Sequence, residues 1–277
     1  MGIVNVTPDS FSDGGQYFKP EEAVRRARNL IDDGADIVDL GGESTRPGAT
    51  PLGWEEEWTR LEPVLRELTA GTVPVSVDTY HPETAEKAIA AGARIINCVS
   101  PGAVPAMLEM LKTHAEVELV IPFRRGVDSA STGCGGDFAS TGRGGDFAST
   151  GCGADSASTG CGADFASVRE LIDRIYLDPM IGFGTTREED LALLKSVPEL
   201  AKLGRVLIGA SRKRIVRKLV MDPDSSESRR QGNAVGKLLG GSVGIAVWCA
   251  MKGVAVVRVH DVKETVQALR AVEALGA

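Results

Sequence analysis

Residues 20–40 read PEEAVRRARNLIDDGADIVDL, and this pattern of a helix followed by a strand recurs along the chain. Pro20 is typical of the first turn of a helix, and the apolar residues after it recur at the spacing of one helical face. Gly34 suits the left-handed turn that ends a helix, and Asp36–Leu40 is a short run rich in β-branched residues. The stretch therefore predicts an amphipathic helix that leads into a strand.

Strand-like runs of this kind occur eight times in the 277 residues. Besides Asp36–Leu40 they are Gly2–Val6, Val73–Asp78, Arg94–Val99, Val117–Phe123, Arg174–Asp178, Arg205–Ala210 and Val254–His260. Several are apolar on both faces and helical segments lie between them, which is typical of a parallel sheet covered by helices. We therefore predict the α/β class and a single (β/α)8 TIM barrel that spans residues 1–277. An open doubly wound sheet is the alternative topology.

The alternation breaks at residues 127–167, between the fifth and sixth runs. A nine-residue unit repeats there, with aspartates in phase at Asp128, Asp137, Asp146, Asp155 and Asp164. Gly, Ala, Ser and Thr fill most other positions, so the tract cannot bury enough apolar surface to offset its ordering entropy. We expect a disordered low-complexity insertion in place of most of the fifth helix, of which Val168–Ile172 would be the remnant. The Gly and Asp spacing also resembles calcium-binding β-solenoid repeats, which is the alternative interpretation.

The charge and the cysteine pattern of the chain exclude several classes of partner. A net charge of −7 and a pI near 5.2 argue against nucleic acids and anionic membranes, which proteins bind mainly through Lys and Arg. The longest apolar stretch, Leu238–Met251, is shorter than the roughly 18 residues that a bilayer span needs. The N-terminus lacks the pattern of a signal peptide, and the five cysteines form no CxxC pair. We therefore expect a cytoplasmic protein with reduced thiols and small-molecule substrates.

Polar side chains stand at or just after the C-terminal ends of the predicted strands, where (β/α)8 barrels carry their active sites. They are Asn5, Asp39, Asp78, Asn97, Asp178, Ser211, Lys213, Arg258 and His260. Arg258 and His260 are two residues apart and so share one face of the eighth strand. With Lys213 they follow strands seven and eight, where such barrels commonly hold phosphate, and they predict an anionic ligand group. For the neighbouring Arg212 and Arg214 we expect only a solvated helix start.

Asp78, Asn97 and Asp178 are expected to point toward the barrel axis beside Lys213. Carboxylates and an amide that meet in one apolar mouth can pair with the N–H groups of a flat heterocycle. Taken singly, each of these residues could also be a cap at a strand end. Taken together, they predict a nucleobase-like pocket, with cations at one end of the cavity and acids at the other.

Two Gly-rich loops follow the first and second predicted strands. Residues 1–15 read MGIVNVTPDSFSDGG, and residues 39–48 read DLGGESTRPG. Both closely resemble the two substrate loops of the dihydropteroate synthase family, and further matches follow in the family's order along nearly the whole chain. These matches are Val75-Ser-Val-Asp-Thr79, Gly92-Ala-Arg-Ile-Ile-Asn97, Asp178 with Ile181-Gly-Phe-Gly184, Ile208-Gly-Ala-Ser-Arg-Lys213 and Arg258-Val-His-Asp261.

The resemblance implies a role for each candidate residue. The residues that hold the pterin ring would be Asp78, Asn97, Asp178 and Lys213. The residues that hold the diphosphate and its Mg²⁺ would be Asn5, Arg258 and His260, with Asn5 as the metal ligand. The residues that shape the p-aminobenzoate pocket would be Thr45, Arg46, Pro47, Phe183 and Ser211. Asp9 and Asp13 are candidates for stabilising the metal or a cation, and the catalytic residues would be Asp78, Asp178, Lys213, Arg258 and His260.

The implied reaction joins 6-hydroxymethyl-7,8-dihydropterin diphosphate to p-aminobenzoate in folate biosynthesis. The C–O bond to diphosphate would break first, and the aniline nitrogen would attack the resonance-stabilised pterin methylene cation. Mg²⁺, Arg258 and His260 would stabilise the leaving group, and Asp78 and Asp178 the cationic ring. The resemblance also implies a sulfonamide target and a homodimer formed through the last helices.

Three segments depart from the family pattern. Asn97-Cys98 stands where Asn-Asp is usual, Ile121-Pro-Phe-Arg124 where Met-His-Met is usual, and Asp178-Pro-Met180 where Asp-Pro-Gly is usual. We expect strain at Met180, because this turn favours Gly. The alternative functions are a pterin-binding methyltransferase module that serves a corrinoid protein, and a catalytically decayed synthase homologue.

Overall fold

The computed structural model describes residues 1–7, 19–43, 50–124, 165–220 and 238–276. These residues form eight strands, each parallel to the next, in the order β1-β2-β3-β4-β5-β6-β7-β8. Their bounds are β1 Gly2–Asn5, β2 Val38–Gly41, β3 Val75–Asp78, β4 Ile95–Asn97, β5 Glu118–Pro122, β6 Ile175–Asp178, β7 Arg205–Ile208 and β8 Val256–Val257. All eight predicted strands are confirmed, and each is shorter than the run that predicted it.

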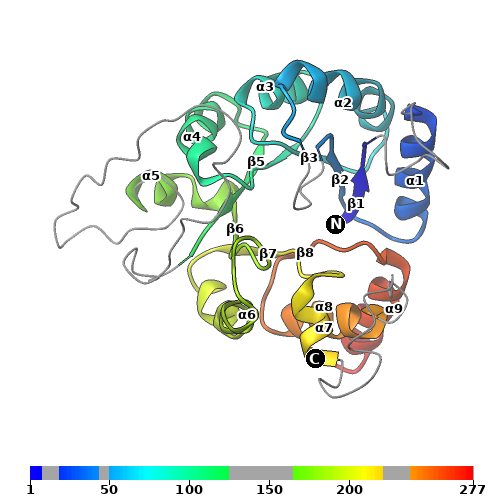
Figure 1. The fold of residues 1–277 in the computed structure, drawn as a ribbon, viewed down its shortest axis with the longest axis vertical. Coiled ribbons are helices and arrows are strands. Elements are labelled where there is room, and N and C mark those ends of the chain that lie inside the picture. Colours follow the sequence, from blue (N-terminus) through cyan, green and yellow to red (C-terminus); the bar gives the residue numbers. More distant parts are fainter. Residues whose placement is uncertain (8–18, 44–49, 125–164, 221–237, 277) are drawn as a thin grey trace.

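The sheet closes into a barrel because the segment after β8 also contacts β1 (Figure 1). Gly2 and Val259 form a parallel bridge, and the amide of Ile3 donates to the carbonyl of Val259 over 3.1 Å. The amide of Val259 in turn donates to the carbonyl of Met1 over 2.9 Å. A doubly wound sheet would stay open and its strand order would reverse at a switch point. The (β/α)8 barrel is therefore confirmed, and the open sheet is wrong.

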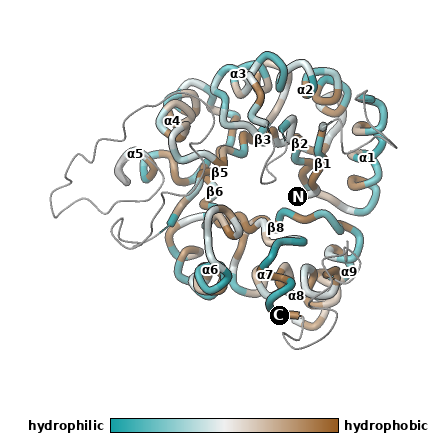
Figure 2. Tube along the Cα trace, in the orientation of Figure 1, coloured by the Kyte–Doolittle hydropathy of each residue, from teal (hydrophilic) through white to brown (hydrophobic). Residues whose placement is uncertain are grey.

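The helices of the described residues lie outside the ring of strands (Figure 1). Their bounds are α1 Pro20–Asp32, α2 Trp54–Thr69, α3 Pro82–Ala90, α4 Val104–Thr113, α5 Phe165–Glu170, α6 Arg187–Leu200, α7 Arg214–Val220, α8 Leu239–Met251 and α9 Val262–Ala274. Figure 2 shows hydrophobic residues along the strands and hydrophilic residues on much of the helical surface. In the part of the chain that the structure describes, no helix is long and apolar enough to cross a membrane.

Helix α1 has the features predicted from residues 20–34. On α1 the side chains of Ala23, Val24, Ala27 and Leu30 are buried, and Gly34 follows the helix with a φ of +99°. The fifth helix differs, because α5 begins before the predicted remnant at Val168–Ile172. The predicted repeat insertion lies mostly outside the described residues, which omit 125–164.

Candidate active site

The strand ends meet because inward-facing side chains alternate along each strand. An apolar layer, the floor layer, lies inside the barrel and consists of Met1, Ile95, Val120, Tyr176 and Leu207, with Ile37 and Val256 packed against it. A side chain two positions farther along a strand points to the same face. The next inward positions after Ile37, Ile95, Tyr176 and Val256 are Asp39, Asn97, Asp178 and Arg258. These residues, with Asp78 beside Asn97 in register, form the site layer above the apolar floor.

Arg258 lies between two carboxylates of the site layer. Its Nε donates to Asp39 Oδ2 over 2.6 Å, and its Nη2 donates to Asp78 Oδ2 over 2.8 Å. Asn97 Nδ2 also donates to Asp39 Oδ2, over 3.3 Å. The expectation that cations and acids occupy opposite ends of the cavity is therefore wrong. The cation of the eighth strand is paired with the acids of the second and third strands.

Burial changes the proton affinity of Asp78. It raises the pKa of this carboxyl to about 7, while Arg258 opposes the rise and Asp39 and Asp178 add to it. Asp78 therefore takes up a proton more readily than an ordinary aspartate does. The pair that Arg258 forms with Asp78 is accordingly easier to open than a fully charged pair in the same place.

Two oxygens of the site layer accept no hydrogen bond from the described residues. They are Asp39 Oδ1 and Asn97 Oδ1, and both are buried. Buried polar atoms are nearly always paired in folded proteins, because an unpaired one loses its hydration without compensation. These acceptors therefore fit a ligand that brings N–H groups into the mouth of the barrel, as the sequence predicts for Asn97.

A second group of contacts forms where β6 ends. Asp178 is 7% exposed, and its Oδ1 accepts a hydrogen bond from the amide of Met180 over 2.8 Å. Lys213 Nζ donates to the carbonyl of Ile181 over 2.5 Å and lies 4.2 Å from the centre of the Phe183 ring. Burial raises the pKa of Asp178, and Lys213 opposes that rise. Burial also lowers the pKa of Lys213 to about 8, and Asp178 opposes that fall. Each charge therefore stabilises the other.

The turn after β6 leaves room for the lysine stem. Gly182 has a φ of +81°, and a Cβ at this position would lie 3.0 Å from Lys213 Cδ. Met180 has a φ of 61° and is 6% exposed, so a bulky residue occupies a left-handed conformation. The strain expected at Met180 is thus confirmed, since such a conformation costs about 1 kcal/mol or more for a residue with a side chain.

The surroundings of His260 favour the neutral form of its imidazole. Its Nδ1 lies 3.2 Å from Ser211 Oγ, and burial, followed by the charges of Arg212 and Arg258, lowers its pKa to about 4. Arg212 is not merely solvated as expected: both carboxylate oxygens of Asp261 bind its guanidinium, one of them over 3.0 Å to Nε. Arg214 is exposed and donates to the Thr185 carbonyl over 3.0 Å. At the phosphate end predicted from the sequence, His260 therefore contacts Ser211, and both Arg212 and Arg258 are paired with acids.

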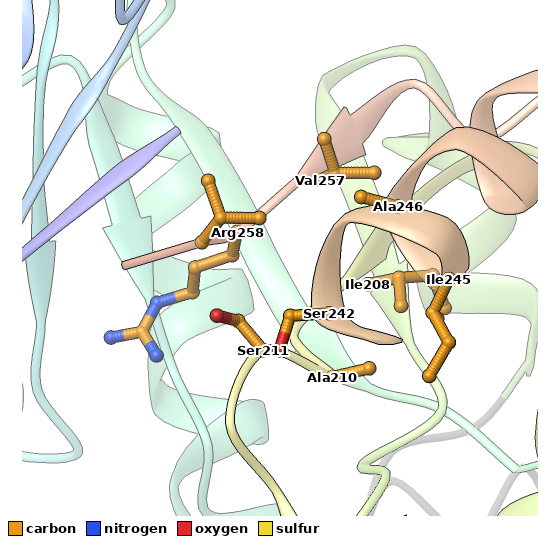
Figure 3. Close-up of a pocket in the computed structure, with 9 residues that line it drawn as sticks. Ile208, Ala210, Ser211, Ser242, Ile245, Ala246, Val257 and Arg258 are labelled. Atoms are coloured by element: carbon orange, nitrogen blue, oxygen red, sulfur yellow. The ribbon is translucent and has the colours of Figure 1, made fainter. Parts of the chain in front are cut away.

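A small cavity lies behind Ser211 and Arg258 (Figure 3). Its volume is about 10 Å³, and its walls come mainly from β7, β8 and α8. Figure 3 shows the guanidinium of Arg258 pointing away from the apolar side chains that line this space. A cavity of this size holds a single water at most. It is therefore a packing gap beside the site layer and not a substrate pocket.

Asn5 is the residue predicted to bind the metal. It is exposed at the end of β1, in register with Gly41, which is itself in register with Asp78. Among the described residues no cluster of three or more His, Cys, Asp or Glu side chains could hold a metal ion. The amide oxygen of Asn5 is a hard ligand, and Mg²⁺ often takes few protein ligands and completes its shell with substrate phosphates and water. The residues present therefore fit Mg²⁺ that arrives with a diphosphate.

Other predicted site residues lie outside the described part of the chain. These are Asp9 and Asp13 of the first loop, and Thr45, Arg46 and Pro47 of the second. Phe183 is half-buried and lies beside Lys213, and Ser211 is buried beside His260.

Two residues that depart from the family pattern, Cys98 and Arg124, lie in different places relative to the site layer. Cys98 is 1% exposed, belongs to the core between the strands and the helices, and faces away from the site layer. Arg124, by contrast, reaches the site: its Nη2 donates to the Phe183 carbonyl over 2.9 Å and to the Met180 carbonyl over 3.4 Å. Sequence reasoning missed this role, as it missed Asp39 as the partner of Arg258. The available signal was that Arg124 follows Val120 and Pro122 on the inward face of its strand.

Comparison with known proteins agrees with this geometry. The model of the pterin binding enzyme family matches residues 1–134 and 166–260, so the gap falls within the predicted repeat insertion. The chain is 38% identical to the dihydropteroate synthase of Neisseria meningitidis serogroup C, over 100% of this chain and 92% of the relative. It is 35% identical to that of Mycobacterium leprae, over 99% and 92% of the two chains.

Solved structures give the same result. The dihydropteroate synthase of Xanthomonas albilineans with 4-aminobenzoic acid superposes with a TM-score of 0.72 at 35% identity, covering 100% of this chain and 93% of that one. The same enzyme in complex with 7,8-dihydropteroate gives a TM-score of 0.69 at 32% identity, with the same coverage. The barrel, the site layer and these full-length likenesses lead to one conclusion: the chain belongs to the pterin binding enzyme family and, within it, to the dihydropteroate synthases.

Proposed function

We propose that the chain condenses 6-hydroxymethyl-7,8-dihydropterin diphosphate with p-aminobenzoate to give 7,8-dihydropteroate and diphosphate, a step of folate biosynthesis. The observation that carries the proposal is the site layer, in which Asp178, Asn97 and the Arg258–Asp78 pair open onto one mouth. The Xanthomonas structures with 4-aminobenzoic acid and with 7,8-dihydropteroate support the same pair of ligands here.

The pterin ring would bind through acceptors in the site layer. Asn97 Oδ1 needs a donor, and Asp178 has a second carboxylate oxygen besides the one that the Met180 amide binds. An amino-pyrimidinone edge offers adjacent N–H donors that match a carboxylate and an amide. The ammonium of Lys213 beside Asp178 would then donate to a ring acceptor. This arrangement supports Asp78, Asn97, Asp178 and Lys213 as the ring-binding residues.

The diphosphate would bind at Arg258, His260 and Asn5. Arg258 is charged at any physiological pH and can turn part of its guanidinium to a phosphate when Asp78 takes up a proton. His260 is neutral and would contribute a hydrogen bond. When bound at Asn5, Mg²⁺ would supply positive charge that stabilises the leaving group.

The geometry supports a reaction in which the C–O bond of the substrate breaks before the C–N bond forms. The electron pair of the C–O bond leaves with diphosphate, which Arg258 stabilises, and the methylene carbon becomes cationic. Anionic Asp178 stabilises this ring cation at close range in a buried setting, where charge interactions are strong. The aniline nitrogen of p-aminobenzoate then attacks the methylene carbon and loses a proton to solvent. Phe183 and Ser211 would line the side from which it approaches.

We also propose that two copies of the chain associate through the last helices. Leu219 and Val220 on α7, and Trp248 and Met251 on α8, are apolar residues that remain exposed in the described chain. Exposed apolar residues on two neighbouring helices would suit a subunit contact. The buried free thiols of Cys98 and Cys249 support a reducing compartment such as the cytoplasm.

The test of the proposed function is a coupled assay for diphosphate release, with the product identified by mass. Release should require the pterin diphosphate, p-aminobenzoate and Mg²⁺ together, and the product should be 7,8-dihydropteroate. Binding of the pterin diphosphate without release in the presence of p-aminobenzoate would contradict synthase activity and favour a decayed homologue. Transfer of a methyl group from a methylated pterin to a corrinoid protein would favour the methyltransferase module instead.

A further inference from the structure

Arg124 is a cation at the mouth of the barrel to which the proposed reaction gives no role. It stands two residues after Pro122, which pairs in register with Asp178, and the amide of Phe123 donates to the Asp178 carbonyl over 2.7 Å. The side chain of Arg124 is only partly exposed. The end of β5 therefore places this guanidinium directly beside the strand that carries Asp178.

The contacts of Arg124 converge on the turn that follows Asp178. Its Nη2 donates to the carbonyls of Met180 and Phe183, over 3.4 and 2.9 Å. The carbonyl of Ile181, between them, accepts from Lys213 Nζ over 2.5 Å. Two cations, Arg124 after β5 and Lys213 after β7, thus hold three carbonyls of one short turn. This is a high density of charged donors for a segment whose first residue has the strained φ of 61°.

Asp178 also lies within the field of Arg124. The charged groups that act on the Asp178 carboxyl are Lys213, Arg258 and Arg124, which lower its pKa, and Asp78 at the end of β3, an acid of the same site layer. Lys213 and Arg258 each have other acidic partners, and the charge of Arg124 also acts on the exposed Glu189, but the hydrogen bonds of Arg124 to the turn are to neutral carbonyls. Its charge is therefore available to the carboxylate at the start of the turn.

We infer that Arg124 is a positioning residue of the reaction: it holds the Met180–Phe183 turn against Lys213, so that the Asp178 carboxylate and the Phe183 ring face the substrate. The kinetic part of this inference rests on the proposed function. The positive charge of Arg124 also keeps Asp178 ionised to lower pH, in the form that stabilises a cationic ring.

The test compares three variants with the wild-type chain. Arg124→Met removes the charge and both donors but keeps the stem, and Arg124→Lys keeps the charge but cannot span both carbonyls. Arg174→Met is the matched control, because Arg174 also donates to backbone carbonyls, those of His114 and Leu111 over 2.7 and 2.9 Å, but at the start of β6 and away from the site layer. The measurements are kcat/KM against pH and the ¹³C titration of the Asp178 carboxyl, identified by its loss in Asp178→Asn.

For Arg124→Met we expect the acid limb of kcat/KM and the Asp178 titration to move up by about half a pH unit or more, because a nearby opposite charge is lost. We also expect kcat/KM at its optimum to fall about tenfold. Arg124→Lys should keep the wild-type titration and lose several-fold in kcat/KM. Arg174→Met should lower thermal stability and leave the titration in place.

Three outcomes would overturn the inference. The first is an Asp178 titration that does not shift in Arg124→Met, and the second is an equal shift in Arg174→Met. The third is a wild-type kcat/KM in Arg124→Lys. The third outcome decides the question even if Arg124→Met does not fold. A wild-type chain without turnover would defeat the proposed function alone, because the carboxyl titration needs no activity and still tests the position of Arg124.

Discussion

The acids of the site layer differ in the cation that each one faces. Arg258 bonds directly to Asp39 and Asp78, whereas Lys213 opposes the effect of burial on Asp178 without donating to it in this structure. A bound pterin cation would therefore meet, at Asp178, a carboxylate to which no side-chain cation of the described residues donates directly. Among the single residues, we therefore expect the chemistry to depend most on Asp178.

Asp178→Asn keeps the shape of the side chain and removes its charge. We expect kcat/KM for the pterin diphosphate to fall by about 10²- to 10³-fold, because one preorganised electrostatic partner lowers the activation free energy by about 3 kcal/mol. Steady-state kinetics measure this loss. The control is Asp173→Asn, an exposed carboxyl before β6, which should stay within about twofold of wild type. Similar losses in both variants would contradict the assignment.

The free energy of unfolding of the chain should depend on pH through His260. Its folded pKa of about 4 lies below the ordinary 6.5, so between these values the unfolded chain binds more protons than the folded one. The contribution of this residue to the free energy of unfolding therefore rises with pH across that window, by at most about 3 kcal/mol. His260→Gln should flatten the rise, as measured by urea unfolding at pH 4.5 and pH 7. An unchanged difference between the two pH values would show that His260 is not buried as a neutral ring.

Among the elements, the turn after β6 controls the position of Lys213. Gly182→Ala places a Cβ 3.0 Å from Lys213 Cδ and imposes the left-handed conformation on a residue with a side chain. We expect a loss of about 1–2 kcal/mol in stability and a rise in KM for the pterin diphosphate. Gly184→Ala is the matched control, since φ is +62° there but a Cβ would meet no atom within 4 Å. Thermal unfolding measures the loss of stability, and steady-state kinetics measure the rise in KM. An equal rise in KM in both variants would contradict the role of Gly182.

The elements were predictable from the sequence to different degrees. The eight strands were predictable, because each is a short β-branched run bounded by helical segments. Helix α1 was also predictable, because its apolar spacing and Gly34 are local signals. The start of α5 was not predictable, since Phe165, Ala166 and Ser167 continue the low-complexity composition and carry no helical period. The polar strand ends were found, but their pairing was not. Asp39 and Asp78 are 219 and 180 residues away from Arg258 in the sequence, and no local pattern indicates that such distant residues are partners.

The whole molecule is expected to be a dimer of barrels. Trp248→Glu combined with Met251→Glu puts charge on the exposed apolar face of α8, and burying these charges in an interface would be costly. We expect sedimentation equilibrium to give the mass of a dimer for the wild-type chain and of a monomer for the double variant. Two equal masses would place the subunit contact elsewhere.

We propose that side chains from Asn5 to His260 form one site around the barrel mouth. The most direct measurement is a crystal structure of the chain with the pterin diphosphate and Mg²⁺. We expect the ring to contact Asn97 Oδ1 and the Asp178 carboxylate, and the diphosphate to lie against Arg258 with Mg²⁺ at Asn5. A substrate bound away from the site layer, or a ring that leaves Asn97 and Asp178 without contact, would contradict it.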